Sequence, residues 1–470
     1  MNFAFHSFRR SFRAGALAAV LVVGPALAAA ETLTDALIDA YRNSNLLEQN
    51  RALLRIADED VALAMSELRP TINFVSRATE DFIDRSGRQE TGVVPESAND
   101  TTISYALELR ITLLDAGQRG MQVALTKESV LGAREGLRAV EQNVLLSAAD
   151  AFFRVLSAQA FVELGENNVR LITEELQAAR DRFEVGEVTR TDVALAESSL
   201  AGARSSLAAA RGDLEASREA FRAAVGRYPG DLQVPRTTPA TAATLEEAVA
   251  VAMRRHPEIR RAQREVTAAG IAADIAGRAY GPSLRATGSL STDSTGRESQ
   301  TLGLEFNQPI YAGGRLAALE RQAIAQADQA RAALHETTRT ISERVRVAWS
   351  RIAVSRAQIT ATQQQVAAAQ IAFDGTREEA RLGARTTLDV LNAEQDLRNA
   401  QASRIDARAQ QFFANYSLLS AMGLLTVEHL GLGVPTYDPS AYYNAVESAP
   451  ARLSPQGERL DRVLNRLGRQ

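Results

Sequence analysis

The stretch that decides the fold is Ile103-Ser104-Tyr105-Ala106-Leu107-Glu108-Leu109-Arg110-Ile111-Thr112-Leu113. Every odd-numbered residue in it is apolar, and every even-numbered residue is small or polar. Because successive side chains of a strand point to opposite faces, this pattern predicts a strand with one apolar and one polar face. Roughly 9–11 residues are also enough for a tilted strand to cross a bilayer. A half-buried strand of a soluble sheet would alternate in the same way, so the surrounding sequence has to distinguish the two.

The first 30 residues have the pattern of a secretory signal peptide. The basic segment Arg9–Arg13 precedes the apolar run Ala14–Leu27, and the small residues Ala28–Ala30 follow it. This order is typical of a signal peptide and its cleavage site. We therefore expect residues 1–30 to be removed and the mature chain to begin at Glu31. An uncleaved anchor helix fits less well, because the apolar run is short for a membrane helix.

Charge and composition exclude several classes of function. The chain has 53 basic and 57 acidic residues, and removal of residues 1–30, which hold three arginines and no acid, changes the net charge from −4 to −7. Such an acidic balance does not suit nucleic-acid binding. No later segment approaches the ~18 uninterrupted apolar residues of a membrane helix, so a mature chain that enters a membrane must do so as strands. The absence of cysteine excludes disulfides, thiolate metal sites and a lipid-bearing N-terminal cysteine.

The chain after the signal peptide contains an internal repeat. Positions early in the repeat recur at an offset of 212 residues, and later positions recur at 197. Examples are Leu33 and Leu245, Pro70 and Pro282, Gly186 and Gly383, and Asp192 and Asp389. The offset changes between Pro70 and Leu107, so the first copy has a loop there that is about 15 residues longer. Insertions collect in exposed loops, which predicts a hairpin tip at this place.

The repeat predicts the domain organisation: repeat 1 over residues 31–230, a linker over 231–243, repeat 2 over 244–430 and a tail over 431–470. Each copy reads as a helix ended by a proline, a β-hairpin, a very long helix, a glycine turn and a second helix. In repeat 1 these are helix 32–68, strands 71–78 and 103–113 in hairpin 71–113, helix 120–182 and helix 192–225. In repeat 2 they are helix 245–279, strands 283–290 and 301–310 in hairpin 283–310, helix 315–381 and helix 389–422.

The long helices have a seven-residue period of small and β-branched residues. One series in the first copy is Val130, Leu137, Val144, Ala151 and Ala158, and a second runs from Ala148 to Phe183. Copy two repeats both series at an offset of 197. A sustained heptad period predicts a left-handed supercoil. Sixty-three residues at a rise of about 1.5 Å make a rod of roughly 95 Å.

The strands of both hairpins present an apolar face, which in the last strand consists of Leu302, Leu304, Phe306 and Ile310. Two hairpins give four strands with open edges, and open edges cannot lie in lipid because their backbone groups would be unpaired. Either the strands form a small soluble sheet, or several chains pool them into a closed barrel. The signal peptide and the apolar faces favour the barrel. We expect the membrane-facing residues to include Ile103, Tyr105, Leu107, Leu109, Ile111, Leu302, Leu304 and Phe306.

With these features the sequence resembles the TolC family of outer-membrane efflux and secretion channels over almost the whole mature chain. At the strand-to-helix junctions the matching motifs are Leu114-Asp115-Ala116-Gly117-Gln118-Arg119 and Ile310-Tyr311-Ala312-Gly313-Gly314-Arg315. At the helix-to-helix turns they are Val185-Gly186-Glu187-Val188-Thr189-Arg190-Thr191-Asp192-Val193 and Leu382-Gly383-Ala384-Arg385-Thr386-Thr387-Leu388-Asp389-Val390-Leu391. The tail 430–443, with its Gly, Pro and Tyr residues, looks most like the type I secretion branch, and the missing lipid-attachment cysteine argues against the lipoprotein branch.

The resemblance implies an α+β membrane protein: a homotrimer with a long coiled-coil helical barrel and a 12-stranded transmembrane β-barrel, four strands per chain. The strands would form a pore in outer-membrane lipid, and the helices a tunnel across the periplasm. It also implies two partners, a periplasmic adaptor (membrane fusion) protein and an inner-membrane transporter, which in the type I branch is of the ABC type.

The resemblance also suggests roles for residues at the two helix-to-helix turns. Gly186 and Gly383 match family glycines at the periplasmic tip where the adaptor docks, although glycine ends helices in any case. Asp389 matches an acidic position at the pore entrance, the alternative being a helix N-cap. Asn392 stands where the family often has a second acid, which halves the expected negative charge.

A gate latch is the last role that the resemblance implies. In the family, the turn of one repeat holds the turn of the other and keeps the tip shut. Arg385 occupies the arginine position of one such contact, with Thr191 and Asp192 opposite. Ala380 occupies the tyrosine position of the other contact, so only half of the latch is present.

We expect no enzyme activity, because the three histidines of the mature chain, His256, His335 and His429, lack metal-ligand spacing. No catalytic residue, metal or cofactor is predicted. The function that these features favour is export through the outer membrane, most like type I protein secretion. The alternatives are a multidrug efflux channel and a soluble periplasmic coiled-coil adaptor or scaffold, which would also have a signal peptide and heptads.

Overall fold

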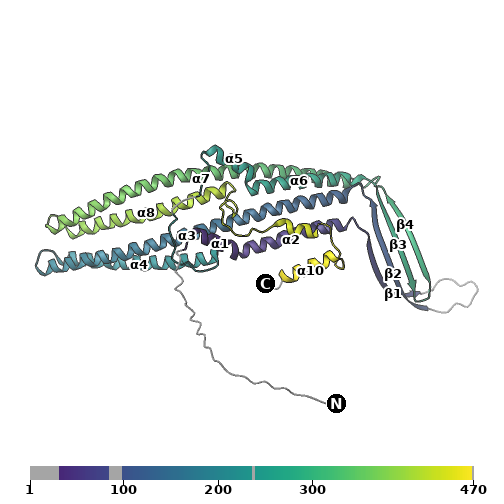
Figure 1. Ribbon diagram of the computed structural model, residues 1–470, viewed down its shortest axis with the longest axis horizontal. Helices are drawn as coiled ribbons and strands as arrows, with labels where there is room; N and C mark the ends of the chain where they lie inside the picture. The colour runs from purple at the N-terminus through teal and green to yellow at the C-terminus, as the bar shows by residue number, and fades with distance from the viewer. Residues whose placement is uncertain (1–30, 84–97, 236–238, 468–470) are drawn as a thin grey trace, which may run out of the picture.

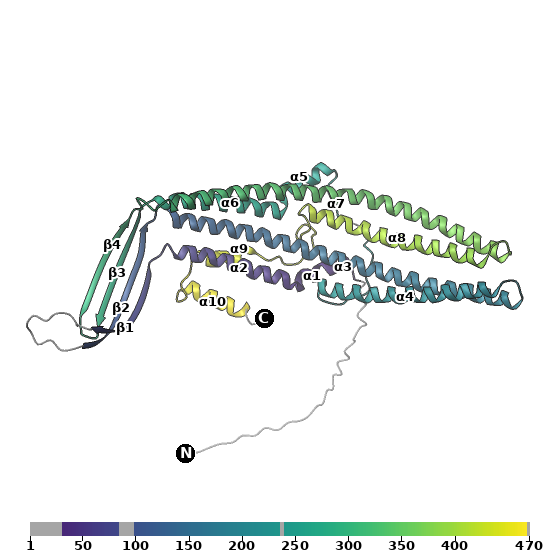
Figure 2. The same ribbon diagram turned by 180° about the vertical axis from the view of Figure 1, so that it is seen from behind.

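The computed structural model describes residues 31–83, 98–235 and 239–467. The expected signal peptide and the inserted loop between the first two strands lie outside the described residues. Figures 1 and 2 show an elongated molecule, in which a layer of long helices runs lengthwise and a sheet extends from one end. The turns of two helical hairpins form the opposite end, so the sheet and these turns are as far apart as the molecule allows.

The longest helices are α3 (Gln118–Glu184) and α7 (Arg315–Arg381), each of 67 residues, or about 100 Å at a rise of ~1.5 Å per residue. Each forms an antiparallel hairpin with the helix that follows it. These partners are α4 (Arg190–Val225) for α3 and α8 (Thr387–Ala421) for α7. The heptad period of the sequence therefore corresponds to pairs of helices within one chain.

Two shorter helices complete the layer on the side of the sheet. They are α2 (Asn45–Ser66) and α6 (Pro257–Gly277), which continue the lines of α4 and α8 (Figure 1). Since α3 contacts all four of these helices and α7 packs on α6 and α8, the layer has four columns. Their order is α2 with α4, then α3, then α6 with α8, then α7.

Most heptad positions are buried in this layer, including Val130, Val155, Ile341 and Val345. Phe183 was expected to continue the series but is 45% exposed, because it lies at the last turn of α3, where the seam ends in this protomer. Among the described residues α3 is the one helix long and apolar enough to cross a membrane, and half of that stretch is buried in the protomer.

The prediction of one continuous helix before each hairpin is wrong. The first copy has α1 (Leu33–Asn43) and α2, separated at Ser44, whose hydroxyl caps the second helix by accepting from the Leu47 N–H at 3.2 Å. The second copy has α5 (Leu245–Arg255) and α6, separated at His256. Pro257 is the first residue of α6, where its missing N–H costs no hydrogen bond and its ring sets the helical φ angle.

The sheet has the order β1-β2-β3-β4 and is antiparallel throughout. Its strands are β1 (Thr71–Ile83), β2 (Ala98–Leu114), β3 (Ser283–Asp293) and β4 (Glu298–Asn307). The strands extend further toward the hairpin tips than the alternation predicts. In contrast, β4 ends before Ile310, which is 95% exposed outside the strand. Pro309 follows the strand closely, and it cannot donate a ladder hydrogen bond.

The motif at the β2–α3 junction turns the chain sharply from sheet to helix. Ala116 and Gly117 have φ angles of +54° and +79°. The Arg119 guanidinium stabilises the turn by donating to the Asp115 carboxylate at 2.6 Å and to the Thr112 carbonyl at 2.8 Å. A Cβ on Gly281 would lie 2.4 Å from the Ala116 Cβ, so glycine is required where the second copy crosses this turn.

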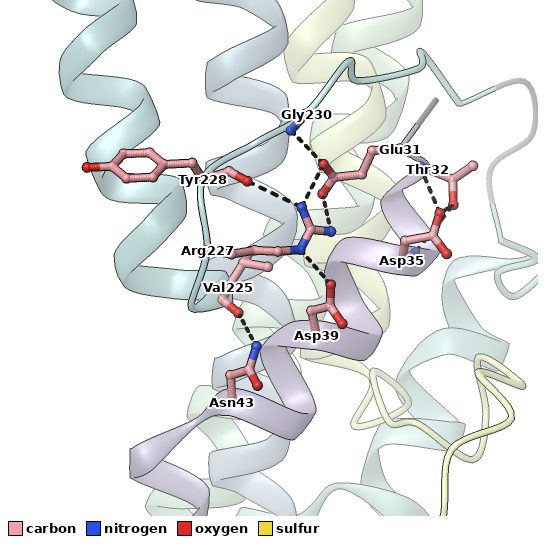
Figure 3. A network of polar contacts seen from close by, with 9 residues as sticks. All are labelled: Glu31, Thr32, Asp35, Asp39, Asn43, Val225, Arg227, Tyr228 and Gly230. Atoms are coloured by element: carbon pink, nitrogen blue, oxygen red, sulfur yellow. Dashed lines mark hydrogen bonds and ion pairs between the residues drawn. The ribbon is translucent and has the colours of Figure 1, made fainter. Parts of the chain in front are cut away.

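A polar network joins the start of the described chain to the end of α4 (Figure 3). The Arg227 guanidinium donates to the Glu31 carboxylate at 2.9 Å and to the Asp39 carboxylate at 2.7 Å. The Gly230 N–H donates to the same Glu31 carboxylate at 2.8 Å. The Glu31 hydrogen bonds raise the pKa of the Arg227 guanidinium, so it remains charged and ties α1 to the segment that directly follows α4.

The tail 431–470, for which no helix or strand was named from the sequence, contains α9 (Pro439–Val446) and α10 (Pro455–Leu467). α9 packs on α2, and Figure 2 shows α9 and α10 on the same side of the layer as α2. The residues just before them, including Leu425, Val427 and Leu432, are buried against α1 and α3. The tail through α9 therefore belongs to the folded body of the protein.

Candidate functional site

One face of the sheet is mostly apolar across all four strands, with polar residues such as Ser76, Thr292 and Glu298 only toward the hairpin tips. Strand register places Ile72 beside Leu109, Gly288 beside Leu109 on the other side, and Leu302 beside Gly288. Seven of the eight residues expected to face the membrane are at least 38% exposed in the protomer, and Ile111 is half-buried. These seven are Ile103, Tyr105, Leu107, Leu109, Leu302, Leu304 and Phe306.

The opposite face of the sheet is polar. Glu108 lies between Asn73 of β1 and Ser289 of β3, and Arg285 is paired with Glu305. One face thus suits lipid and the other suits water, as in the strands of a transmembrane barrel. The two edge strands, β1 and β4, have no neighbour on their outer sides within the described residues.

The turns at the far end each contain the glycine that the sequence analysis singled out. Gly186 and Gly383 have φ angles of +79° and +80°, a conformation that glycine adopts without strain. The Gly186 N–H donates to the Phe183 carbonyl at 3.0 Å, and the next N–H donates to the Arg182 carbonyl at 2.8 Å. The same pair of bonds occurs after α7. Both glycines therefore end a long helix in a Schellman motif.

The two aspartates of the turns begin the return helices. Asp192 and Asp389 accept from the backbone N–H groups of Thr189 and Thr386, both at 2.9 Å, while the threonine hydroxyls accept from the aspartate N–H groups. These are capping boxes in which each threonine is the N-cap, so Asp389 supports the cap and is not the cap itself. Hydrogen bonds from the threonines hold the pKa of both carboxyls below the usual range.

The structure places Arg385 close to a different acid from the one expected. Its Nε donates to the Glu379 carboxylate at 2.9 Å, and this bond raises the pKa of the guanidinium. Within the described part of a single protomer, Arg385 forms no ion pair with Asp192 or hydrogen bond to Thr191. Thr191 and Asn392 are exposed and Asp389 is half-exposed, so these side chains remain available to molecules outside the protomer.

Two contacts that the sequence analysis missed join the repeats near the tip. The Arg182 guanidinium donates to the Ala380 carbonyl at 3.4 Å. Arg377 pairs with Glu175 at 2.8 Å, and the Glu175 carboxylate is largely buried. Both contacts run between α3 and α7, which are about 200 residues apart in sequence. No local motif predicts such pairs, because each depends on how the two helical hairpins approach each other near their turns.

A buried acid in α8 was also missed. Glu394 is 6% exposed in the seam that contains Val390 and Leu397. Burial raises the pKa of the Glu394 carboxyl to about 7, against the opposing charge of Arg398. The helical spacing of Glu394 with its apolar neighbours was visible in the sequence, but a charged residue on a seam is more often solvated.

Comparisons with known proteins agree with this geometry. The sequence profile of the family described as "Outer membrane efflux protein" matches residues 36–227 and 249–424. The outer membrane efflux protein BepC of Brucella suis biovar 1 (strain 1330) is 37% identical over 446 residues, which cover 92% of this chain and 94% of BepC. The outer membrane protein TolC of Vibrio cholerae is 26% identical, with 84% of this chain and 92% of that protein covered.

Two further similarities concern secretion and fold. The proteases secretion protein PrtF of Dickeya chrysanthemi is 25% identical, with 88% of this chain and 93% of PrtF covered. The crystal structure of the Campylobacter jejuni CmeC outer membrane channel superposes with a TM-score of 0.75 at 17% identity, covering 89% of this chain and 90% of CmeC. The second similarity establishes the shared fold.

The apolar sheet face at one end of a layer of ~100 Å helices defines the class of an outer-membrane channel. The chain belongs to the outer membrane efflux protein family, and it is a channel of the TolC type located in the outer membrane, with its helices in the periplasm. The family consists of channel proteins and not of enzymes. The alternative of a soluble periplasmic scaffold is therefore wrong.

Proposed function

We propose that three copies of the chain close side by side into one channel-tunnel that spans the outer membrane and the periplasm. The observation that carries this proposal is the match between the open edges of the sheet and of the helical layer. The edge strand β1 follows α2, which lies on one edge of the layer, and the edge strand β4 leads into α7, which lies on the other. A neighbouring copy can therefore satisfy both edges at once, and three copies supply twelve strands.

Exposed apolar residues lie along the two helix edges that such closure would bury. On α2 they are Leu46, Leu53, Ile56 and Leu63, each 48–64% exposed. Their spacings of seven, three and seven residues form a heptad stripe that faces away from the protomer. On α7, Leu319 and Ile324 are 42% and 46% exposed near the sheet. Packing α7 of one copy on α2 of the next would cover both sets.

The tunnel would export substrates that an inner-membrane transporter and a periplasmic adaptor deliver. Type I protein secretion with an ABC transporter is supported by the similarity to PrtF over 88% of the chain. Multidrug efflux is the second candidate. It is favoured by the 37% identity to BepC, which is named an outer membrane efflux protein. In both cases the conduit is passive, and the transporter selects the substrate.

The turns at the far end would form the entrance of the tunnel. Asp389 and Asn392 would line it in three copies, and the turns at Gly186 and Gly383 would receive the adaptor. The latch would form when Arg385 exchanges Glu379 for Thr191 and Asp192 across neighbouring turns. The exposure of these residues, and a planar guanidinium that can engage a carboxylate and a hydroxyl together, support this role.

Deletion of the chain in its host separates the two export functions. Loss of secreted proteins from the medium with unchanged drug susceptibility would support type I secretion, and the reverse pattern would support efflux. Trimers are tested separately by chemical crosslinking of outer membranes. A monodisperse monomer in detergent, together with absence of crosslinked trimer, would refute the proposed assembly.

A further inference from the structure

Residues 434–449, which include α9, form a segment that we call the C-terminal strap. The strap crosses α2 from α1 toward the root of β1 (Figure 2). Three hydrogen bonds fasten it along this path: from the Tyr437 N–H to the Tyr41 hydroxyl at 3.4 Å, from the Tyr442 hydroxyl to the Glu59 carboxylate at 2.6 Å, and from the Arg69 guanidinium to the Ala449 carbonyl at 2.7 Å. Arg69 immediately precedes Pro70, so the end of the strap holds the start of the edge strand.

An acidic side chain is buried beneath the strap. Asp58 of α2 is 0% exposed, and neither of its carboxylate oxygens has a hydrogen-bond partner among the described residues. It lies on the helix face of Leu54 and Val61, which pack with Tyr437 and Tyr443 of the strap. An ionised carboxylate without partners is costly in such a place, and the protonated form is favoured there.

A cation of α3 lies close to both this acid and the strap. The Arg134 guanidinium of α3 lies over the Tyr443 ring, 5.1 Å from its centroid. The Arg134 Nε is buried and has no hydrogen-bond partner among the described residues, yet its charge acts on Asp58. Arg134 therefore has three possible partners: the Tyr443 ring of the strap, the Asp438 carboxylate of the strap and the Asp58 carboxylate of α2. In the structure it lies on the ring.

The other groups around Asp58 do not replace Arg134. Burial raises the pKa of the Asp58 carboxyl to about 6, Arg134 opposes the rise and Glu59 adds to it. Arg51 lies between the rings of Tyr41 and Tyr437, 5.4 Å from each centroid. The strap itself faces Asp58 with tyrosines, so it brings no countercharge.

We propose that the strap is a proton-sensitive clamp, seated on α2 while Asp58 is protonated and released when Asp58 ionises and draws Arg134 away from Tyr443. When the strap is released, Asp58 is no longer buried and its pKa would fall back toward the ordinary value of an aspartate. Because the seated state binds the proton more tightly, it is favoured at low pH and loses that advantage as the pH rises from about 4 to about 6. In acid the clamp would thus stiffen the corner between α2 and β1, whether or not the channel is engaged with partners.

A spin label on the strap tests this proposal in the full mature chain in detergent. The chain has no cysteine, so Ala441→Cys on the exposed face of α9 takes the label at one position. The ratio of mobile to immobile label should rise roughly tenfold or more between pH 4 and pH 7, since each pKa unit corresponds to a factor of ten. A ratio that does not change with pH would overturn the proposal.

Three variants separate the clamp from general loosening. Asp58→Asn should keep the label immobile at all pH values, whereas the control Asp60→Asn, on the exposed side of the same helix, should keep the parental profile. Arg134→Met removes the partner that stabilises ionised Asp58 and should move the transition to higher pH. If Asp58→Asn retains the parental pH profile, or Arg134→Met leaves the midpoint unchanged, the clamp is not built from these residues.

Discussion

Substitution of Leu109 by arginine tests which face of the sheet meets lipid. Leu109 lies between Ile72 of β1 and Gly288 of β3 on the apolar face. Ala106, on the same strand, lies between Val75 and Ser291 on the other face. Leu109→Arg would place a charge in lipid, whereas the matched control Ala106→Arg would place it in the water-filled lumen.

The register of the sheet sets the expected magnitude. On β2 the apolar and aromatic side chains of this face run from Tyr105 to Leu114, which is about 30 Å along the strand at ~3.3 Å per residue. A tilt of about 45° reduces this to roughly 21 Å along the membrane normal, near the ~25 Å apolar band of such barrels. Leu109 is at the middle of that span, where arginine costs about 2–4 kcal/mol. Three distant copies would add to about 6–12 kcal/mol per trimer.

The assay is the yield and thermal dissociation of trimers extracted from outer membranes, measured on unheated and heated gels. Leu109→Arg should lower both the yield and the dissociation temperature, and Ala106→Arg should leave both near the parental values. Equal trimer yields from the two variants would show that the faces are wrongly assigned.

Three further predictions follow from the tips, the hairpin and the buried acid of α8. Arg385→Ala should raise single-channel conductance in planar bilayers, and Asp192→Ala should do much the same, with little further gain in the double variant; parental conductance in both single variants would place the latch elsewhere. Deletion of hairpin 71–113 should abolish membrane insertion, as fractionation would detect, because two strands per chain leave the barrel open. Glu394→Gln should raise thermal stability above pH 7 but not at pH 4. The pKa of Glu394 is raised by burial, so the stability that its protonated form provides is lost as the pH rises from 4.5 to about 7. Equal changes in melting temperature at both pH values would contradict this account.

Much of the architecture was predictable because it rests on local chemistry. The alternation around Leu107 predicted a strand with one lipid-facing side, and the glycines at 186 and 383 predicted the ends of the long helices. The N-caps at Ser44 and at His256, just before Pro257, are also local signals of a helix start. They were missed because the apolar pattern continues across both positions, so one helix was predicted where each copy has two. The ends of the long helices were predicted correctly because the glycine turns were the one signal there. The first helix of each copy was not, because the apolar pattern and the capping residues gave opposite indications.

The sequence by itself determined the repeat, the long paired helices, the alternating strands and the turns, because their signals lie within a few residues of one another. The tertiary structure alone decided which distant side chains meet. Arg227 contacts Glu31 across 196 residues, and Asp58 is enclosed by a tail that follows it by nearly 400 residues. Such contacts depend on the order of the columns and on the path of the tail across them. Both of these are set by packing summed over the whole chain, and no short segment encodes them.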